Sequence, residues 1–144
     1  MIAACTSAAA PGWLELRQAL WPGTGEAHRA EMVAFLADPD RYAQFVAYED
    51  GTPAGLAEAA IRSDYVNGTA SSPVAFLEGL YVAPAFRRRG IATELVAKVA
   101  GWARARGCSE LASDALLDNT GSHAAHRALG FDETERVVFF RKPL

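Results

Sequence analysis

Three consecutive arginines and a glycine, Arg87 to Gly90, lie between an apolar segment and a helical pattern. The apolar segment, 74–82, is rich in β-branched and aromatic residues, which predicts a strand that ends before Pro84. A helical periodicity of apolar residues begins at Ile91. The first N–H groups of a helix lack intrahelical partners and carry the positive end of its dipole, so this basic turn predicts a phosphate site. Gly90 has no Cβ and allows a ligand to approach the backbone.

One carboxylate, Glu78, interrupts the apolar strand. Strand alternation places it on the same face as Phe76, Leu80 and Val82, where a charge is costly unless it has a task or a partner. An ion pair with Arg62 on the neighbouring segment is one explanation and a catalytic role is the other. We favour catalysis, because ionisable groups in unfavourable surroundings cluster at functional sites.

A second carboxylate, Asp114, follows the short strand pattern 110–113. Ligands of open α/β sheets bind at the carboxyl ends of strands, so Asp114 is a candidate site residue. A turn or helix-cap role is the alternative.

Strands and helices alternate around these residues. Asp50-Gly51 predicts a tight hairpin turn, and Asn119 is placed to cap a helix. On the second helix we expect Met32, Val33 and Leu36 to face inward. The predicted strands span residues 2–6, 44–49, 54–62, 74–82, 110–113 and 135–141, and the helices span about 11–20, 26–37, 91–106 and 119–129. This order predicts one α/β domain over residues 1–144, a mixed sheet with helices on both faces.

The composition narrows the class of protein. The chain has 144 residues, half of them hydrophobic, and a net charge of −3, which argues against nucleic-acid binding. It contains neither a secretory signal pattern nor a membrane-length apolar run, and Cys5 and Cys108 lie outside any Cys/His cluster. We therefore expect a cytoplasmic protein with reduced cysteines, without a bound metal and without a membrane partner.

The run Arg87-Arg88-Arg89-Gly90-Ile91-Ala92 matches the R-x-x-G-x-A loop of the GNAT superfamily of N-acetyltransferases. With the preceding strand and the later Asn119 and Ala128-Leu129-Gly130-Phe131, nearly the whole chain resembles this superfamily. The resemblance implies a mixed sheet of six to seven strands, about four flanking helices, and a splay between the fourth and fifth strands. It also implies acetyl-CoA as co-substrate, bound by Leu80, Tyr81, Val82, Arg87, Arg88, Arg89, Gly90, Ile91, Ala92, Thr93 and Asn119.

Acetyl transfer to an amine needs a base for the amine and a proton for the departing thiolate. The resemblance implies that Glu78 and Asp114 are the acidic catalytic residues. Many members carry a tyrosine before the Gly-Phe pair, and this chain has His126 there, which is able to protonate a thiolate. Packing against the cofactor is the alternative role for His126.

Segments around Leu20-Trp21-Pro22, Leu77 to Val82 and Ala112 to Val138 resemble one branch, the aminoglycoside 6′-N-acetyltransferases. The branch implies antibiotic resistance by acetylation of a 6′-amine. Polycationic sugars favour carboxylates and flat aromatic surfaces. The implied substrate-binding residues are Trp21, Thr24, Tyr65, Glu78, Asp114 and Glu135, with Thr24 near a place where the branch often has histidine.

Other functions fit parts of this pattern. A polyamine, a peptide N-terminus or a lysine also suits an acidic cleft, and a noncatalytic acyl-CoA-binding domain would keep the basic loop. A structural interaction protein is a third possibility. The segment 137–140, Val-Val-Phe-Phe, is apolar on both faces and predicts burial at a dimer interface or in the sheet of a partner subunit. We expect a homodimer.

Overall fold

The computed structural model describes all residues, 1–144. Its strands are β1 (Ile2–Ala4), β2 (Tyr42–Glu49), β3 (Thr52–Arg62), β4 (Val74–Val82) and β5 (Leu111–Ala112). The helices are α1 (Trp13–Leu20), α2 (Gly25–Leu36), α3 (Ile91–Ala105) and α4 (Thr120–Ala128), with one 3-10 turn at Pro84–Phe86. Every predicted element except the last strand is present, with small shifts at its ends.

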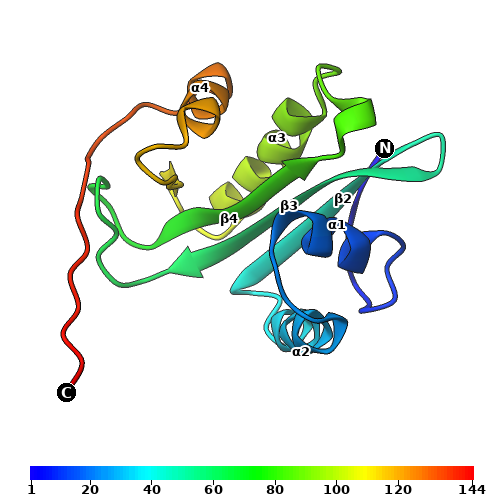
Figure 1. Cartoon of the computed structure of the whole chain (residues 1–144), viewed down its shortest axis with the longest axis horizontal. Coiled ribbons are helices and arrows are strands. Elements are labelled where there is room, and N and C mark those ends of the chain that lie inside the picture. The colour runs from blue at the N-terminus through cyan, green and yellow to red at the C-terminus, as the bar shows by residue number, and fades with distance from the viewer.

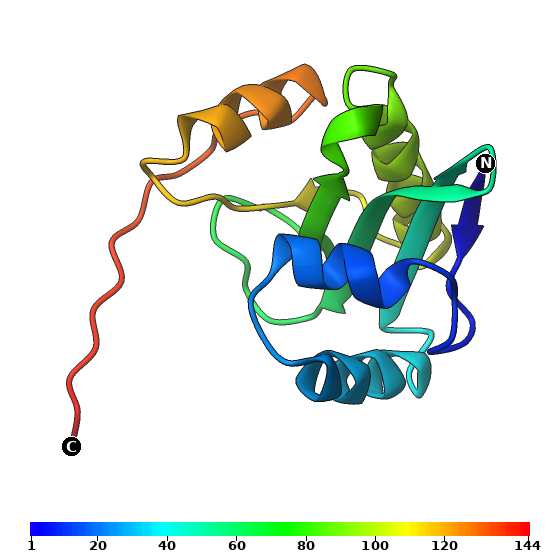
Figure 2. The ribbon, with the colours of Figure 1, turned by 45° about the vertical axis from the view of Figure 1, so that its right-hand side comes forward.

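One mixed sheet runs through the molecule in the order β1-β2-β3-β4-β5. Neighbouring strands are antiparallel except β4 and β5, which are parallel. The hairpin predicted between β2 and β3 is confirmed: Asp50 and Gly51 have φ values of 48° and 79°, as a type I′ turn requires. Helices α1 and α2 cover one face of the sheet and α3 covers the other (Figures 1 and 2).

Each face of the sheet has its own apolar core. Leu95 and Val99 of α3 are fully buried against the alanines of β3, and Trp13 and Met32 are fully buried on the opposite face. The inward stripe of α2 differs from the predicted one. Val33 is 59% exposed, and His28 is buried instead because it lies one turn before Met32 on the same face.

The splay between β4 and β5 is present. The two strands pair only at Ala75–Leu111 and Phe76–Ala112, after which β5 ends and β4 continues to Val82. The start of α3, after β4, and the whole of α4, after β5, lie toward the same end of the molecule (Figures 1 and 2). The separation of these strands therefore opens the sheet near the predicted phosphate loop.

The strand predicted over 135–141 is wrong for the sheet of its own chain, so five strands form instead of six to seven. Residues 131–144 have neither helix nor strand. Phe131 packs on the core and Thr134 lies against Gly68, and the rest of the segment runs away from the body (Figures 1 and 2). The apolar residues of this segment pair with no strand and are left in solvent, since Val138 is 73% exposed, Phe139 85% and Phe140 93%. Local β-propensity cannot make a strand without a neighbour to accept its hydrogen bonds.

Both cysteines are free and buried. Burial, together with the nearby charge of Glu58, raises the pKa of Cys5 to about 12, and burial also raises the pKa of Cys108. Both thiols therefore stay protonated and are poor nucleophiles. None of the helices is long and apolar enough to cross a membrane.

Candidate active site

Glu78 lies at a break in the pairing of β4 with β3. Glu58 faces Gly79 and Ala59 faces Leu77, so Glu78 is an extra residue with no partner across the strands. Such a bulge shifts the alternation of side chains by one residue. Leu77 and Leu80 both pack on the α3 side, so the expectation that Glu78 shares a face with Leu80 and Val82 is wrong. Glu78 faces the α1–α2 side, opposite Leu77, and the bulge after it places Leu80 and Val82 on the α3 side.

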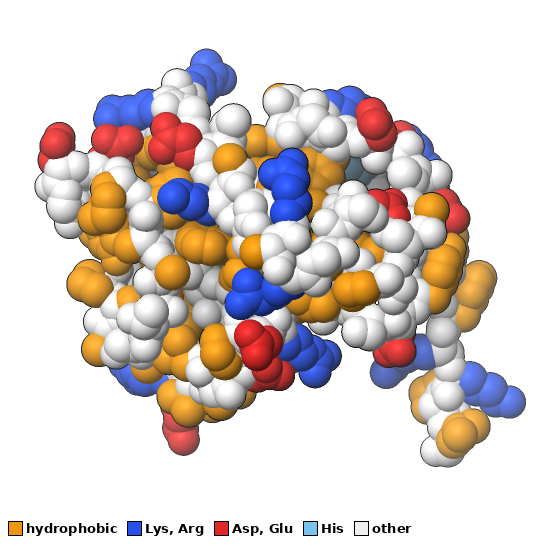
Figure 3. Space-filling view, turned by 180° about the vertical axis from the view of Figure 1, so that it is seen from behind, with side chains coloured by type: hydrophobic (Ala, Val, Ile, Leu, Met, Phe, Trp, Pro, Cys, Tyr) orange, Lys and Arg blue, Asp and Glu red, His pale blue; other side chains and the backbone are white.

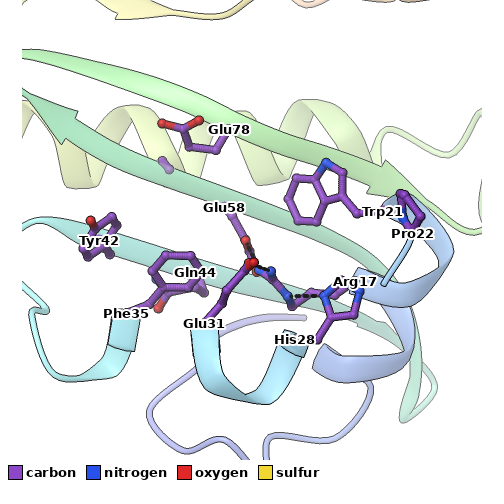
Figure 4. A pocket seen from close by; sticks show the side chains of 11 residues that line it. Arg17, Trp21, Pro22, His28, Glu31, Phe35, Tyr42, Gln44, Glu58 and Glu78 are labelled. Carbon is purple, nitrogen blue, oxygen red and sulfur yellow. Dashed lines mark hydrogen bonds and ion pairs between the residues drawn. The ribbon is translucent and has the colours of Figure 1, made fainter. Parts of the chain in front are cut away.

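Glu78 there lines an open cavity of about 470 Å³ between α1, α2 and strands β2 to β4 (Figure 4). We call this the acidic cavity, because Glu31, Glu58 and Glu78 line it against a single guanidinium, that of Arg17. Trp21, Phe35 and Tyr42 also line it. This balance of charge, with aromatic walls, suits a cationic ligand with flat faces.

Arg17 is the centre of a buried polar network on the floor of the acidic cavity. Its side chain is 2% exposed and donates to the carboxylates of Glu58 and Glu31. Its Nε donates to His28 Nδ1 at 3.2 Å, and Trp13 Nε1 donates to Glu58 Oε1 at 2.7 Å. The sequence did not predict this network. A charged residue on an amphipathic helix, such as Arg17 on α1, is expected to face solvent, so its burial could not be inferred from the helical pattern.

Glu78 also has an ion-pair partner, as one of the two explanations anticipated. Arg62 Nη2 lies 2.8 Å from Oε1 and 3.0 Å from Oε2 of Glu78, and the guanidinium stacks over Phe76 at 3.6 Å. The pair is not buried, since the two side chains are 41% and 36% exposed. A ligand cation can therefore reach the same carboxylate from solvent.

Trp21 is held against the sheet by a glycine. A Cβ on Gly79 would overlap the Trp21 indole and lie 3.0 Å from Leu20 Cδ2, so only glycine lets the ring lie against β4. The guanidinium of Arg17 lies 5.0 Å from the centre of the Trp21 ring. The indole is thus fixed between a strand and a buried cation.

The predicted phosphate loop has the expected form. Gly90 precedes α3 with φ 81°, a conformation costly for other residues, and nothing lies within 4 Å of where its Cβ would be. Arg88 also has a positive φ, 63°, and Arg87 Nε donates to the Val82 carbonyl at 2.8 Å. The exposed arginines and the free N–H groups at the start of α3 form a site for an anion.

The other predicted site residues are spread over several loops. Thr24 caps α2 through Ala27 N at 3.1 Å, and Asn119 caps α4 through Ser122 N at 3.1 Å, which confirms the capping part of its predicted role. Tyr65, Asp114 and Glu135 are exposed and do not line the acidic cavity.

His126 and the Tyr65 loop are held by polar contacts. His126 is half-buried and binds Ser113 and Ser122. The Tyr65 loop is tied to the start of β5, because Ser71 and the Ala70 amide donate to Glu110 and so lower its pKa. No group of three or more His, Cys, Asp or Glu side chains is placed to hold a metal.

The splayed sheet, the bulged central strand and the glycine-preceded helix together define an acyltransferase architecture. The chain belongs to the acetyltransferase (GNAT) family, and the sequence pattern of this family matches residues 13–131.

Its relatives are more specific. The chain is 54% identical over 145 residues to an aminoglycoside N(6′)-acetyltransferase type 1 of Serratia marcescens, covering 100% of this chain and 99% of the relative. It is 57% identical over 131 residues to a protein of the same name from Acinetobacter genomosp. 13, covering 90% of this chain and 89% of the relative.

Solved structures agree with these relatives. The aminoglycoside antibiotic 6′-N-acetyltransferase AAC(6′)-IG from Acinetobacter haemolyticus superposes with a TM-score of 0.94 at 49% identity, covering 100% of this chain and 99% of that one. AAC(6′)-Iy in complex with the bisubstrate analogue CoA-S-monomethyl-acetylneamine superposes with a TM-score of 0.94 at 48% identity, covering 100% and 98%.

Proposed function

We propose that this chain is an aminoglycoside 6′-N-acetyltransferase that confers antibiotic resistance by acetylating the 6′-amine of the drug with acetyl-CoA. The observation that carries this proposal is the acidic cavity, which places the bulged Glu78 within reach of a cation. The chain forms one domain over residues 1–144 and acts in the cytoplasm.

The basic loop and the open edge of β4 suit the co-substrate. Arg87, Arg88 and Arg89 and the backbone from Gly90 to Thr93 bind its phosphates. Its extended arm binds along the edge of β4 that β5 leaves free, through the main chain of Leu80, Tyr81 and Val82. The side chain of Asn119 also contacts this arm. Acetyl-CoA supplies a thioester whose carbonyl carbon accepts the amine.

The reaction begins with a proton, because an ammonium group has no lone pair for attack. Glu78 takes that proton, directly or through water, and the amine attacks the thioester carbonyl. Backbone N–H groups beyond the bulge stabilise the oxyanion that forms. Asp114 provides a second carboxylate at the end of β5, and His126 takes part in protonating the thiolate.

Substrate recognition follows from charge and shape. Glu78, Asp114 and Glu135 attract the ammonium groups of the drug, while Trp21 and Tyr65 provide flat surfaces for sugar rings. Thr24 caps α2 two residues after Pro22, which lines the cavity, and its size contributes to the choice of drug.

Thiol release from acetyl-CoA tests this function with a panel of aminoglycosides that have or lack a 6′-amine. Release confined to the 6′-amino drugs would establish the reaction and its position. Release with polyamines or peptides alone would transfer the proposal to those substrates. If acetyl-CoA bound tightly and none of these amines released thiol, the chain would instead be a noncatalytic acyl-CoA-binding domain.

Gly79→Ala is expected to raise the KM for the drug about tenfold, equivalent to ~1.4 kcal/mol, because the new Cβ displaces the Trp21 indole. Steady-state kinetics at saturating acetyl-CoA would measure it. Gly101→Ala is the matched control, since Gly101 has nothing within 4 Å of its Cβ position. A KM unchanged in Gly79→Ala would remove Trp21 from the substrate site.

We further propose that the protein is a homodimer in which the segment 131–144 of each copy packs on the other. Phe131 and Thr134 still contact their own chain, whereas the end of the segment stands clear of it with hydrophobic side chains along it (Figure 3). The outer edge of β5 has no strand beside it, and both a free sheet edge and an exposed apolar segment are stabilised by pairing with another chain. Phe139 and Phe140 would bury their rings in such a contact.

Phe139→Asp is expected to give a mass near 15.4 kDa by light scattering at micromolar concentration, whereas the native chain gives about twice that mass. Burying a carboxylate in an apolar contact is costly, so the dimer is lost. Val33→Asp, at another exposed apolar residue, should leave the mass unchanged. A monomeric native chain would contradict the assembly.

A further inference from the structure

A serine and a histidine form a hydrogen-bonded pair at the end of β5. Ser113 Oγ lies 2.7 Å from His126 Nε2, and the other ring nitrogen, Nδ1, lies 2.7 Å from the carbonyl oxygen of Ser122. A carbonyl only accepts, so Nδ1 carries a hydrogen and Nε2 is the nitrogen that exchanges a proton with Ser113. Both ring nitrogens of His126 are therefore occupied within the protein.

The pair is located where β4 and β5 separate. Ser113 follows the last residue of β5, and its Oγ lies 3.5 Å from the carbonyl oxygen of Leu77, the residue before Glu78. Both members are half-buried, and the His126 ring packs edge-on against Phe131 with centroids 5.3 Å apart. The geometry holds the hydroxyl of Ser113, not the imidazole, toward the bulged strand.

The remaining histidines have other partners. His28 accepts from buried Arg17, and His123 contacts the Leu116 carbonyl at 2.9 Å. Both cysteines keep their protons because burial raises the pKa of each. The Ser122 hydroxyl lies 3.3 Å from Nδ1 of the same ring, but it is the Ser113 hydroxyl that also lies next to a β4 carbonyl.

We propose that Ser113 is the catalytic residue that protonates the departing CoA thiolate, and that His126 is a positioning residue that returns the proton to Ser113. This rests on the proposed function and reassigns the role predicted for His126, which acts through Ser113. The sequence suggested the histidine, but only the fold brings Ser113 to its Nε2.

The step balances. When the tetrahedral intermediate collapses, the C–S bond breaks and its electron pair goes to sulfur. Sulfur takes the proton of Ser113 Oγ, and Oγ takes the Nε2 proton of a protonated His126. His126 is left neutral, with Nδ1–H still bound to the Ser122 carbonyl. The drug nitrogen starts as an ammonium and ends as an amide N–H, so it loses two protons. Glu78 takes the first before attack and passes it to water, and then takes the second from the nitrogen of the tetrahedral intermediate. Exchange with water returns Glu78 to its carboxylate and His126 to its protonated form.

Two variants of equal shape test the hydroxyl. Ser113→Thr should keep single-turnover acetyl transfer to a 6′-amino drug within a few-fold of the native rate, whereas Ser113→Val should lose about 10²-fold or more. Acetyl-CoA binding, measured by calorimetry, should be equal in the two and shows that both fold. Ser109→Ala, at an exposed serine outside the site, is the control for losing a hydroxyl. Equal transfer rates for Thr and Val would overturn the proposal.

His126→Gln tests the second proton through the pH profile. The native rate should fall at high pH as the relay loses its proton, and the variant rate should be lower and lack this fall. The solvent deuterium isotope effect of the native enzyme should indicate that two protons are transferred in the rate-limiting step. The Ser113→Val variant should show no such isotope effect. A high-pH fall kept in His126→Gln would overturn the role of His126. Failure of the native protein to acetylate any aminoglycoside would instead refute the proposed function.

Discussion

Glu78→Gln is expected to lower kcat for aminoglycoside acetylation by roughly 10²–10⁴-fold, the range that a positioned general base contributes. Glutamine has nearly the same shape but cannot take a proton from the ammonium group. The residual rate should rise steadily with pH, since the fraction of free amine then depends on solvent alone. Single-turnover kinetics from pH 6 to 9 would measure both effects.

Two controls separate this loss from damage to the fold. Acetyl-CoA affinity should be unchanged in Glu78→Gln, because the basic loop at Gly90 lies beyond the end of β4. Glu15→Gln, at an exposed carboxylate on α1, should keep the native rate. Native kcat in Glu78→Gln would leave Glu78 as a mere partner of Arg62 and move the base elsewhere.

Arg17→Met is expected to lower the free energy of unfolding by about 3–5 kcal/mol, because it leaves the Glu58 carboxylate buried without its cation. His28 Nδ1 loses its donor at the same time. Urea denaturation would measure the change. Trp21 should also become more mobile, since the guanidinium beside its ring is gone.

Arg62→Met is the matched comparison, because it removes an arginine from a pair whose members are 41% and 36% exposed. Such a pair contributes at most about 1 kcal/mol in water. The double variant Arg17→Met with Glu58→Gln should recover part of the lost stability, since the buried charge is gone and Trp13 keeps an acceptor. Equal losses of unfolding free energy for Arg17→Met and Arg62→Met would contradict the burial of Arg17 and Glu58, because water would then have to reach both groups.

What the sequence by itself determined about this protein is local in the chain. The strand 74–82, the basic turn and the helix from Ile91 are contiguous, so the phosphate loop follows from propensities and helix-end chemistry. The Asp50-Gly51 hairpin and the Asn119 cap are equally local.

Tertiary structure decided the rest, because those features depend on which residues meet across the sheet. The bulge that puts Glu78 and Leu80 on opposite faces exists only in the pairing of β4 with β3. The burial of Arg17 needs Glu58 and Glu31 from two other elements, and the pair of Ser113 with His126 needs α4 to pack at the end of β5. The segment 135–141 has the composition of a strand but lies beside no strand of its own chain, so composition alone did not make it one.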